Sequence, residues 1–363
     1  MEKLQPKLRF PEFVKDWSNE DIHSILKIGS GRDYKHLNYG NIPVFGTGGL
    51  MTYVNDFLYN GETVCIGRKG TIDKPMYYNG PIWTVDTLFY THSFKNTLPK
   101  FIYFCFLNIN WKEYNEASGV PSLSKSTIER IIISFPSLPE QQKIASFLTT
   151  VDDKISNLKQ KVRILVKYKK GVMQQIFSQQ IRFKDTAGND FPEWEEKSLG
   201  EIGKFYVGGD LDKLEYKKEY SEDFVYPIYA NGAGEGLYGY AKNFQYLEGC
   251  VTVSGRGNLG LAKYRKNKFN AIVRLIVIQP NENTHPKFLE EYINNIRFIV
   301  ESTGVPQLTV PQISKYKIIQ PQIKEQTKIA EFLSGIDSKI ETTKLQLSKM
   351  EVWKKGLLQG MFC

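Results

Sequence analysis

One block of this sequence occurs twice. Residues 119–178 align with residues 304–363 at a constant offset of 185 without a gap, and 23 of the 60 aligned positions are identical. The first copy contains LPEQQKIASFLTTVDDKI, and the second contains IKEQTKIAEFLSGIDSKI. The second copy runs to the last residue of the sequence, so we interpret the chain as a complete tandem duplication. Two like but non-identical halves suit a task with two like but non-identical targets.

Apolar residues recur at steps of three and four through both copies of the block. A seam sustained for about five heptads predicts a coiled coil rather than a lone surface helix. Pro139-Glu140 and Lys324-Glu325 mark the expected helix starts. The predicted seam consists of Ile144, Leu148, Val151, Ile155, Leu158, Val162 and Leu165 in the first copy, and of Ile329, Leu333, Ile336, Ile340, Leu347 and Met350 in the second.

Each predicted helix has two possible partners, its own globular part or the other helix. We favour mutual packing, and because duplicated halves are normally related by a pseudo-twofold axis we expect antiparallel helices. About 38 residues at ~1.5 Å each form a rod of roughly 55 Å. Lys169 and Lys354 interrupt the seam, and each is followed two residues later by glycine. Lysine stems reaching out to water are the favoured interpretation, and a contact point for a partner is the alternative.

The two remaining parts of the chain match each other more loosely. Each begins with a Phe-Pro-Glu-aromatic run, at residues 10–13 and 191–194, and continues with short strand patterns around glycine-rich turns. We therefore predict an α+β fold, in which two mixed α/β domains alternate with two long helices that pack as an antiparallel coiled coil in a pseudo-twofold internal repeat. The predicted boundaries are 1–139 for the first domain, 140–185 for the central helix and linker, 186–324 for the second domain and 325–363 for the last helix.

Composition indicates a globular chain with a local basic excess. The formal net charge is +9, and residues 140–184 alone carry ten basic and three acidic side chains. That excess suits either DNA or an acidic partner surface. The four cysteines, Cys65, Cys105, Cys250 and Cys363, form no CxxC pair, and the four histidines are scattered. We therefore expect reduced thiols, no metal site and a cytoplasmic location. No apolar run reaches the ~20 residues of a membrane span, and the start does not read as a secretory signal.

Motifs for chemistry are missing from the sequence. Residues 255–260 satisfy GxGxxG, but a strand pattern follows where a dinucleotide site needs a helix, so a tight hairpin is the better interpretation. There is no GxxxxGK[ST] and no NPPY-like or DPPY-like tetrapeptide. Asp152-Asp153-Lys154 and Asp337-Ser338-Lys339 lie within the heptad pattern, where we expect charges on a solvated helix face. We predict that this chain is not an enzyme.

Together these features resemble the specificity subunit of type I restriction–modification systems. The resemblance is carried by Leu138–Ile155 and its echo at Ile323–Ile340, by the segments LRFPEF and DFPEW, and by the Gly-Val-Pro loops at 119–121 and 304–306. It spans essentially the whole chain.

The resemblance implies a division of labour. In that family each globular part is a target-recognition domain that binds one half of a split double-stranded DNA sequence. The helices set the spacing between the halves and dock two DNA methyltransferase subunits, which methylate adenine. Restriction and translocation subunits are further partners. The resemblance implies no cofactor in this chain, since S-adenosylmethionine, ATP and Mg belong to the partner subunits. A rod of ~55 Å spans roughly 16 base pairs, so two domains near its ends could lie about one helical turn apart on one DNA face.

Long cations and amides in the glycine-rich loops are the candidate DNA-binding residues. Such side chains suit phosphate contacts, and arginine and asparagine can also bind base edges. In the first half the candidates are Arg32, Lys35, His36, Thr47, Arg68, Lys69, Thr71, Lys74, Ser122, Ser124 and Lys125. In the second half they are Asn231, Arg256, Asn258, Lys263, Tyr264, Arg265, Lys266, Lys268, Gln307 and Thr309, with Arg274 as a further cation. Each of them could instead be an ordinary solvated side chain.

Two other functions stay open at this point. A free-standing two-headed DNA-binding regulator would bind DNA tightly without partners, whereas a specificity subunit would need its methyltransferase. A self-sufficient methyltransferase or nuclease is disfavoured by the missing motifs. The sequence gives neither the target nor the spacer length.

Overall fold

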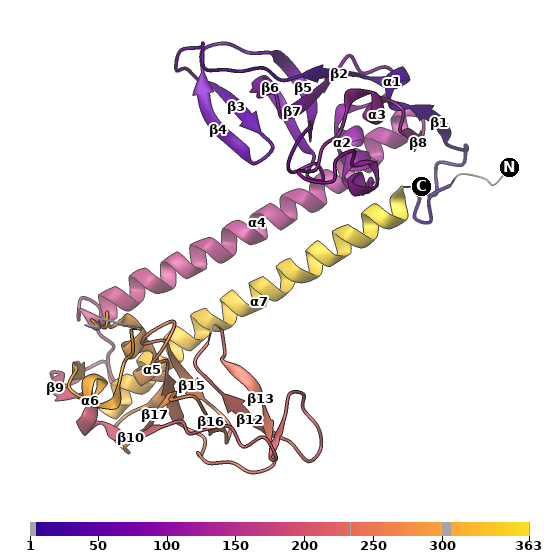
Figure 1. Cartoon of the computed structure of the whole chain (residues 1–363). Coiled ribbons are helices and arrows are strands. Elements are labelled where there is room, and N and C mark those ends of the chain that lie inside the picture. The colour runs from indigo at the N-terminus through magenta and orange to yellow at the C-terminus, as the bar shows by residue number, and fades with distance from the viewer. Residues whose placement is uncertain (1–4, 233, 300–305, 363) are drawn as a thin grey trace. The chain divides into compact units, whose positions relative to one another are not determined.

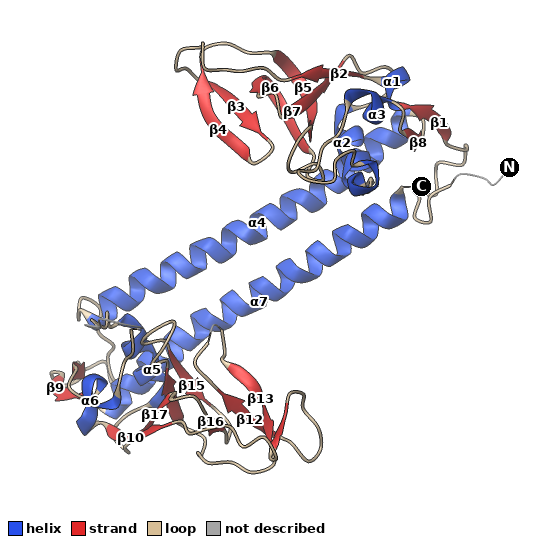
Figure 2. Cartoon of the chain, viewed as in Figure 1, coloured by secondary structure: helices blue, strands red, loops and turns tan. Residues whose placement is uncertain are grey.

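The fold consists of two compact units that share two long helices. The computed structural model describes residues 5–232, 234–299 and 306–362, so Gly304 and Val305 of the second Gly-Val-Pro loop lie outside the described residues. Unit 1 comprises Met1–Gln160 and Lys344–Cys363, and unit 2 comprises Lys161–Thr343. The long helices α4 (Leu138–Phe177) and α7 (Ile323–Met361) each contribute to both units (Figures 1 and 2).

Unit 1 is built on a six-stranded sheet with the order β2-β7-β5-β6-β3-β4. All neighbours are antiparallel except β3 and β6, which are parallel. A separate antiparallel pair, β1 and β8, lies beside it in the fold. The strands are β1 (Ser18–Asp21), β2 (Lys27–Ser30), β3 (Ile42–Gly46), β4 (Gly49–Val54), β5 (Tyr59–Gly67), β6 (Met76–Thr84), β7 (Leu88–His92) and β8 (Ile132–Phe135), and the short helices are α1 (Ile22–Ile25), α2 (Pro99–Asn108) and α3 (Lys125–Glu129), with a 3-10 turn at Trp111–Tyr114.

Unit 2 repeats this plan with two smaller sheets and an antiparallel pair, β9 and β18. The order β10-β17-β14-β15 matches β2-β7-β5-β6, and β12 pairs with β13 and, in parallel, with β16, as β3 pairs with β4 and β6. The strands are β9 (Glu195–Ser198), β10 (Gly203–Val207), β11 (Tyr216–Lys217), β12 (Tyr226–Tyr229), β13 (Leu237–Ala241), β14 (Cys250–Val253), β15 (Ala262–Arg265), β16 (Asn270–Ala271), β17 (Ile276–Pro280) and β18 (Lys317–Gln320), and the helices are α5 (Pro286–Asn295) and α6 (Val310–Ile313), with a 3-10 turn at Leu199–Glu201.

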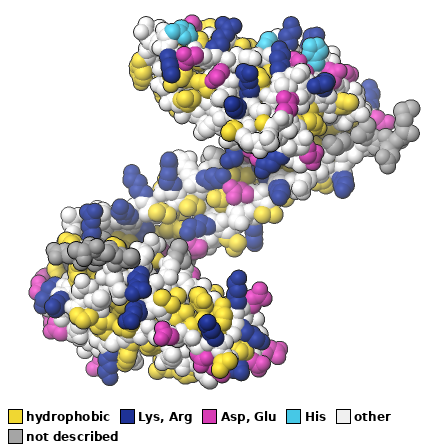
Figure 3. Space-filling model, in the orientation of Figure 1, with side chains coloured by type: hydrophobic (Ala, Val, Ile, Leu, Met, Phe, Trp, Pro, Cys, Tyr) yellow, Lys and Arg dark blue, Asp and Glu magenta, His cyan; other side chains and the backbone are white. Residues whose placement is uncertain are grey.

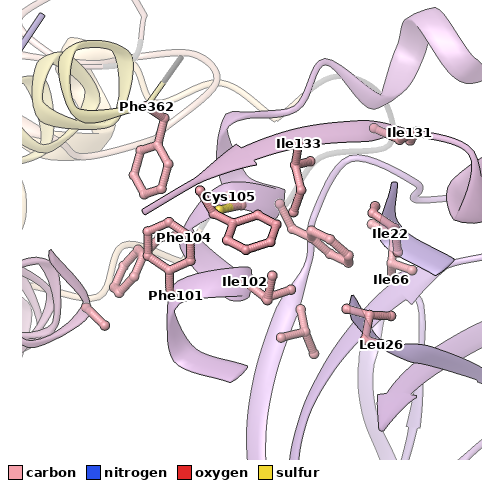
Figure 4. Close-up of a cluster of buried hydrophobic side chains, with 14 of the residues drawn as sticks. Ile22, Leu26, Ile66, Phe101, Ile102, Phe104, Cys105, Ile131, Ile133 and Phe362 are labelled. Atoms are coloured by element: carbon pink, nitrogen blue, oxygen red, sulfur yellow. The ribbon is translucent and has the colours of Figure 1, made fainter. Parts of the chain in front are cut away.

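The core of unit 1 joins the globular part to the long helices. Helix α2, which begins with proline at its first turn, buries Phe101 and Phe104, and the ring of Phe362 lies 5.5 Å from that of Phe101 (Figure 4). Ile144 and Leu148 of α4 and Leu357 of α7 belong to the same apolar cluster. Burying a large apolar side chain stabilises a fold by about 1.5–3 kcal/mol, so this shared core fixes the helix ends to the domain.

A buried carboxylate near the start of each long helix holds the segment that enters the domain. Glu140 accepts hydrogen bonds from Arg9 Nε and Nη2 at 2.7 and 2.8 Å, and from the Trp17 indole at 3.3 Å. Glu325, 185 residues later, accepts from Arg182 Nε and Nη2 at 3.3 and 3.0 Å, and from the Trp194 indole at 3.0 Å. The negative charge also suits a helix N-terminus. The duplication therefore preserved a complete buried ion-pair arrangement.

Contacts between the long helices are antiparallel within each unit. In unit 1, Lys159 lies 2.8 Å from Glu351, and Asp152 lies 2.6 Å from Lys354, so rising numbers on α4 meet falling numbers on α7. In unit 2, Lys169 lies 2.7 Å from Asp337, and Val172 and Ile176 of α4 share an apolar cluster with residues 329–340 of α7. The predicted fold class, with mixed α/β domains and two long helices in an antiparallel coiled coil, is confirmed.

Burial along the predicted seam is uneven. Nine of its positions are buried, namely Ile144, Leu148, Val151, Ile155, Leu158, Ile329, Leu333, Ile336 and Ile340. The other four, Val162, Leu165, Leu347 and Met350, are only partly buried. The first set lies in the half of each helix that follows its start and packs on a domain core. The helix pair is thus most tightly packed next to the globular parts.

Two expectations about charged residues in the helices are wrong. Asp152 and Asp337 were expected on a solvated face, but each forms an ion pair with the other helix. Lys169 and Lys354 do not simply extend into water, because they are the partners of those aspartates and their side chains are only 18% exposed. Within the part of the chain that the structure describes, no helix is both long and apolar enough to span a membrane.

Candidate nucleic-acid interface

Three loops of unit 1 converge at one end of its sheet. They are the turn after β3, the Gly-Arg-Lys-Gly loop after β5 and the loop after Gly119-Val120-Pro121. Gly70 N donates to Pro121 O at 2.8 Å, and Leu123 N donates to Arg68 O at 2.9 Å. Gly70 has a φ of +92°, and a Cβ there would lie 3.6 Å from Thr47 Oγ1. We call these loops, with Thr47, Arg68, Lys69 and Ser122, the unit 1 loop cluster.

The turn between β6 and β7 fixes the cationic loop of this cluster. Thr87 O accepts hydrogen bonds from Arg68 N at 2.8 Å and from Lys69 N at 3.3 Å, and Val85 N donates to Phe45 O at 3.0 Å. The side chains of Arg68 and Lys69 remain exposed. Backbone bonds therefore hold the loop while both cations stay exposed at its surface, with Arg68 Nη1 3.4 Å from Asp86 O, an arrangement that suits phosphate or base contacts.

Unit 2 builds the matching cluster with different side chains. Leu308 N donates to Gly255 O at 2.8 Å, which repeats the bond between Leu123 and Arg68. The Asn231 side chain links the same loop to the segment after β16, since its Oδ1 accepts from Gly255 N at 2.8 Å and its Nδ2 donates to Val273 O at 2.6 Å. Arg256 Nη2 donates to Gln307 Oε1 at 3.0 Å. We call Asn231, Arg256 and Gln307 with these loops the unit 2 loop cluster.

The backbone next to the unit 2 loop cluster is strained. Val273 and Arg274 have φ values of 53° and 57°, a region that a β-branched residue rarely adopts. Val273 N and Arg274 N donate to Gly209 O and Gly208 O at 2.8 and 3.0 Å, which holds this conformation. As a result, the Arg274 side chain is exposed beside the cluster. Strain of this kind is concentrated at functional sites in proteins.

Several predicted residues of unit 1 lie apart from its loop cluster or are used within the fold. Ser124 caps α3 and bonds to Glu116, and Lys125 pairs with Glu129 at 3.6 Å. Arg32 N donates to Thr84 O at 2.8 Å, and the His36 ring packs on Trp83. Lys35 and Lys74 are exposed, and Thr71 is half-buried.

Several cations of the expected cluster of unit 2 are used within the fold, and Lys263 and Arg265 both contact Glu235. Arg265 is not the exposed cation that we expected, because it is buried, lies 3.5 Å over the Tyr229 ring and bonds to Thr252 at 2.9 Å. Lys263 pairs with Glu235 at 2.9 Å, and its charge and hydrogen bond lower the pKa of that carboxyl. Lys268 lies over the Phe244 ring, and Thr309 caps α6. The remaining candidates, Asn258, Tyr264 and Lys266, are exposed or half-exposed.

Exposed apolar side chains beside both clusters were not anticipated. Leu50 and Met51 on β4, and Leu237 and Tyr238 on β13, follow the turn that enters each cluster, and all four are about half-exposed. Their alternating pattern predicts strands, but it carries no signal for exposure on both faces. Figure 3 shows Lys and Arg side chains spread over the visible face of each unit, with acidic and apolar side chains between them. On this face the cations are interspersed with acidic and apolar side chains and do not form one continuous basic surface.

Reactive groups are scarce in the described parts of the chain. Cys65, Cys105 and Cys250 are buried, and burial raises the pKa of Cys65 to about 12 and that of Cys250 to about 11, which leaves their thiols protonated and poorly nucleophilic. Among these residues no group of three or more His, Cys, Asp or Glu side chains is placed to hold a metal ion. The surface offers hydrogen-bond donors and positive charge.

Comparison with known proteins identifies similar chains. A sequence model of the type I restriction modification DNA specificity domain matches residues 14–167 and 192–351. S.MpnORF507P of Mycoplasma pneumoniae, a proposed type I specificity subunit, is 27% identical over 367 residues, covering 95% of this chain and 98% of that protein. The type I restriction enzyme MjaIX specificity subunit of Methanocaldococcus jannaschii is 27% identical over 368 residues, covering 85% of this chain and 84% of its own.

Solved structures show the same fold. The crystal structure of a type I restriction–modification S subunit from M. genitalium superposes with a TM-score of 0.72 at 19% identity, and covers 99% of both chains. A chain from a study of complex assembly and conformational transition of the type I R-M system gives a TM-score of 0.54 at 14% identity, over 95% of this chain and 96% of that one.

Proposed function

Since the chain belongs to the type I restriction–modification DNA specificity family, we propose that its two loop clusters bind the two halves of one interrupted, asymmetric DNA sequence. One observation carries the proposal. The same three loops converge in both units, held by the same backbone bond, but they present different side chains. Thr47, Lys69 and Ser122 in unit 1 correspond to Asn231, Arg256 and Gln307 in unit 2. A shared backbone with different donors suits two half-sites of different sequence.

In this proposal the chain supplies recognition and no chemistry. Two adenine-DNA methyltransferase subunits dock on it and bring S-adenosylmethionine, while restriction and translocation subunits, where present, bring ATP and Mg. The buried cysteines and the missing catalytic motifs support this division. The two long helices, continuous from one unit to the other, are suited to set the unread spacer between the half-sites.

Methylation mapping tests the proposal. The chain would be expressed with its cognate methyltransferase, and modified adenines in the host DNA would be sequenced. We expect two short specified blocks separated by a gap of constant length. Modification within one contiguous block would contradict two-site binding. Tight and specific DNA binding by the purified chain without methyltransferase would favour the free-standing regulator.

A further inference from the structure

The turn between β16 and β17 carries an unusual pair of residues (Figure 1). It runs from Ile272 to Leu275 and is closed by a hydrogen bond from Leu275 N to Ile272 O at 3.1 Å. Its two central residues, Val273 and Arg274, both have positive φ values, of 53° and 57°. Positive φ at both central positions is typical of a type I′ turn, which asparagine, aspartate and glycine favour. A valine–arginine pair is therefore not what backbone stability alone would select.

Neighbouring segments hold this turn in place. Its two central N–H groups donate to the carbonyl oxygens of Gly208 and Gly209, and Gly208 N donates in return to Leu275 O at 2.7 Å. A Cβ on Gly208 would lie 2.7 Å from the backbone of β16, so this close approach requires glycine. Asn231 Nδ2 also donates to Val273 O at 2.6 Å. The turn is thus firmly held, although its backbone conformation is unfavourable for its residues.

The turn lies directly against the unit 2 loop cluster. A Cβ on Gly255 would lie 3.4 Å from Arg274 O, and Asn231 joins the two segments because it also accepts from Gly255 N at 2.8 Å. Val273 is 47% exposed, and Arg274 is exposed as well. Among the described residues the Arg274 guanidinium has no hydrogen-bond or ion-pair partner. One apolar side chain and one unpaired cation therefore stand at this surface, next to the loop that carries the exposed Arg256.

The matching turn of unit 1 has the same place in the fold but other residues. It joins β6 to β7, and Leu88 N donates to Val85 O at 2.9 Å. Its central residues are Asp86 and Thr87, and neither has a positive φ. Backbones with opposite signs of φ direct their side chains differently. Unit 1 therefore presents a carboxylate and a hydroxyl where unit 2 presents an apolar group and a guanidinium, as two half-sites of different sequence require.

We propose that Val273 and Arg274 determine two neighbouring base pairs of the half-site that unit 2 binds. Val273 contacts the C5 methyl group of a thymine, and Arg274 donates to O6 and N7 of a guanine in the adjacent base pair. These are the major-groove groups that an apolar side chain and an arginine select. Neighbouring Cα atoms lie about 3.8 Å apart and neighbouring base pairs about 3.4 Å apart, so two adjacent residues can reach two adjacent base pairs. This inference rests on the proposed function, because it takes the loop cluster as a DNA interface.

Modified DNA tests each contact, with the full-length chain assembled with its cognate methyltransferase. In duplexes of the mapped target, each thymine would be replaced in turn by uracil, which removes only the methyl group, and each guanine by 7-deazaguanine, which removes the N7 acceptor. We expect one uracil to weaken binding about three- to fivefold, as loss of one buried methyl group should. One 7-deazaguanine in the adjacent base pair should weaken binding about fivefold or more.

Variants of the turn should abolish these effects one at a time. Val273→Ala should bind the uracil duplex as well as the thymine duplex, and Arg274→Ala should no longer respond to 7-deazaguanine. The matched control is Leu247→Ala, which removes a side chain that is 50% exposed and precedes the opposite end of β14 from Gly255. This control should retain both responses.

A double substitution separates recognition from folding. Val273→Asn together with Arg274→Gly gives the turn residues that its backbone favours, so thermal unfolding should move to a higher temperature. Selectivity at the same two base pairs should nevertheless disappear from the methylation map. A turn with a purely structural role would gain stability and keep the wild-type map, and that result would overturn the proposal.

The outcomes separate this inference from the proposed function. If the wild-type complex modifies no interrupted sequence, the proposed function fails and this inference fails with it. If an interrupted sequence is found but no adjacent thymine and guanine in it depend on Val273 and Arg274, the inference alone is overturned. If Arg274→Ala weakens binding equally for all sequences and Arg274→Lys restores it, Arg274 contacts a phosphate, which overturns its assignment to guanine.

Discussion

Lys354 lies 2.6 Å from Asp152 across the helix pair of unit 1, and the duplication repeats this contact as Lys169 with Asp337 at 2.7 Å in unit 2. Each helix thus carries one aspartate and one lysine at the same spacing. An antiparallel pair matches each aspartate with the lysine of the other helix. A one-turn slip would break both of these contacts between the helices, so the pairs favour the observed register.

Exchanging the charges of one pair should show that the contact is specific. Lys354→Asp places two carboxylates together, and we expect the free energy of unfolding to fall by about 1–3 kcal/mol. Adding Asp152→Lys should recover most of the loss, because the pair is restored in the opposite sense. Urea denaturation of the two single variants and the double variant measures the coupling. If the free energy of unfolding lost in the double variant equals the sum of the losses in the two single variants, the two side chains do not interact.

The Lys169–Asp337 pair predicts a contribution to acid unfolding. Burial acts to raise the pKa of Asp337, but hydrogen bonds and charge from Lys169 and Lys287 outweigh it and lower the pKa below its usual value. A lowered folded-state pKa gives stability that is complete above the unfolded pKa of about 3.9 and is lost as the pH falls through the folded value. Asp337→Asn should therefore be less stable than wild type at pH 6, and the difference should shrink below about pH 4. A difference that stayed constant across urea midpoints at pH 6, 4 and 3 would argue against this assignment.

The loop clusters predict which cations contact DNA. Arg256→Ala, and separately Arg68→Ala, should weaken binding of the assembled complex by about 1–3 kcal/mol if the side chain binds a base, and selectivity should relax at one position of the corresponding half-site. If the side chain binds a phosphate, binding should instead weaken for all sequences, and the slope of log affinity against log salt should drop by about one. Methylation maps and salt titrations distinguish these cases. An unchanged map and unchanged affinity after both substitutions would remove these loops from the interface.

Arg265 provides the contrasting prediction. Its guanidinium is buried over Tyr229 and bonds to Thr252, so Arg265→Ala should lower the stability of unit 2 by about 2–4 kcal/mol and leave buried acceptors without a donor. Thermal unfolding should detect the loss without any DNA present. If the Arg265→Ala variant kept wild-type stability but bound DNA more weakly, the result would instead indicate that Arg265 contacts DNA.

Periodicity and duplication were sufficient to predict the architecture. The helix starts were expected at Pro139-Glu140 and Lys324-Glu325, and the helices begin at Leu138 and Ile323, within the usual uncertainty of helix boundaries. The paired aspartates and lysines were misinterpreted because each partner lies on the other helix. The periodicity of one helix does not show which residues of a second helix lie beside it. Taken alone, Lys169 looks like a break in an apolar seam, and only the antiparallel register places Asp337 beside it.

The loop clusters were predicted less well than the helices. Arg256 and Arg265 lie nine residues apart in one basic stretch, and no feature of that stretch distinguishes an exposed loop cation from one stacked on Tyr229. The positive φ of Val273 could not be predicted from the sequence either, because β-branched residues normally avoid that conformation. Such details depend on which strands become neighbours, and strand pairing is not encoded in local composition.

A fragment of residues 1–185 should self-associate, because α4 carries both Asp152 and Lys169. Two antiparallel copies of α4 can pair each aspartate with the lysine of the other copy, as α4 and α7 do within the chain. Asp152→Lys and Lys169→Asp fragments should each be monomeric alone, since every contact then joins like charges. An equimolar mixture should form a heterodimer in which each contact joins opposite charges, as sedimentation equilibrium would show. With methyltransferase, the wild-type dimer should modify a symmetric interrupted sequence. If the wild-type fragment stayed monomeric at 100-fold the concentration at which the equimolar mixture forms its heterodimer, pairing through this register would be contradicted.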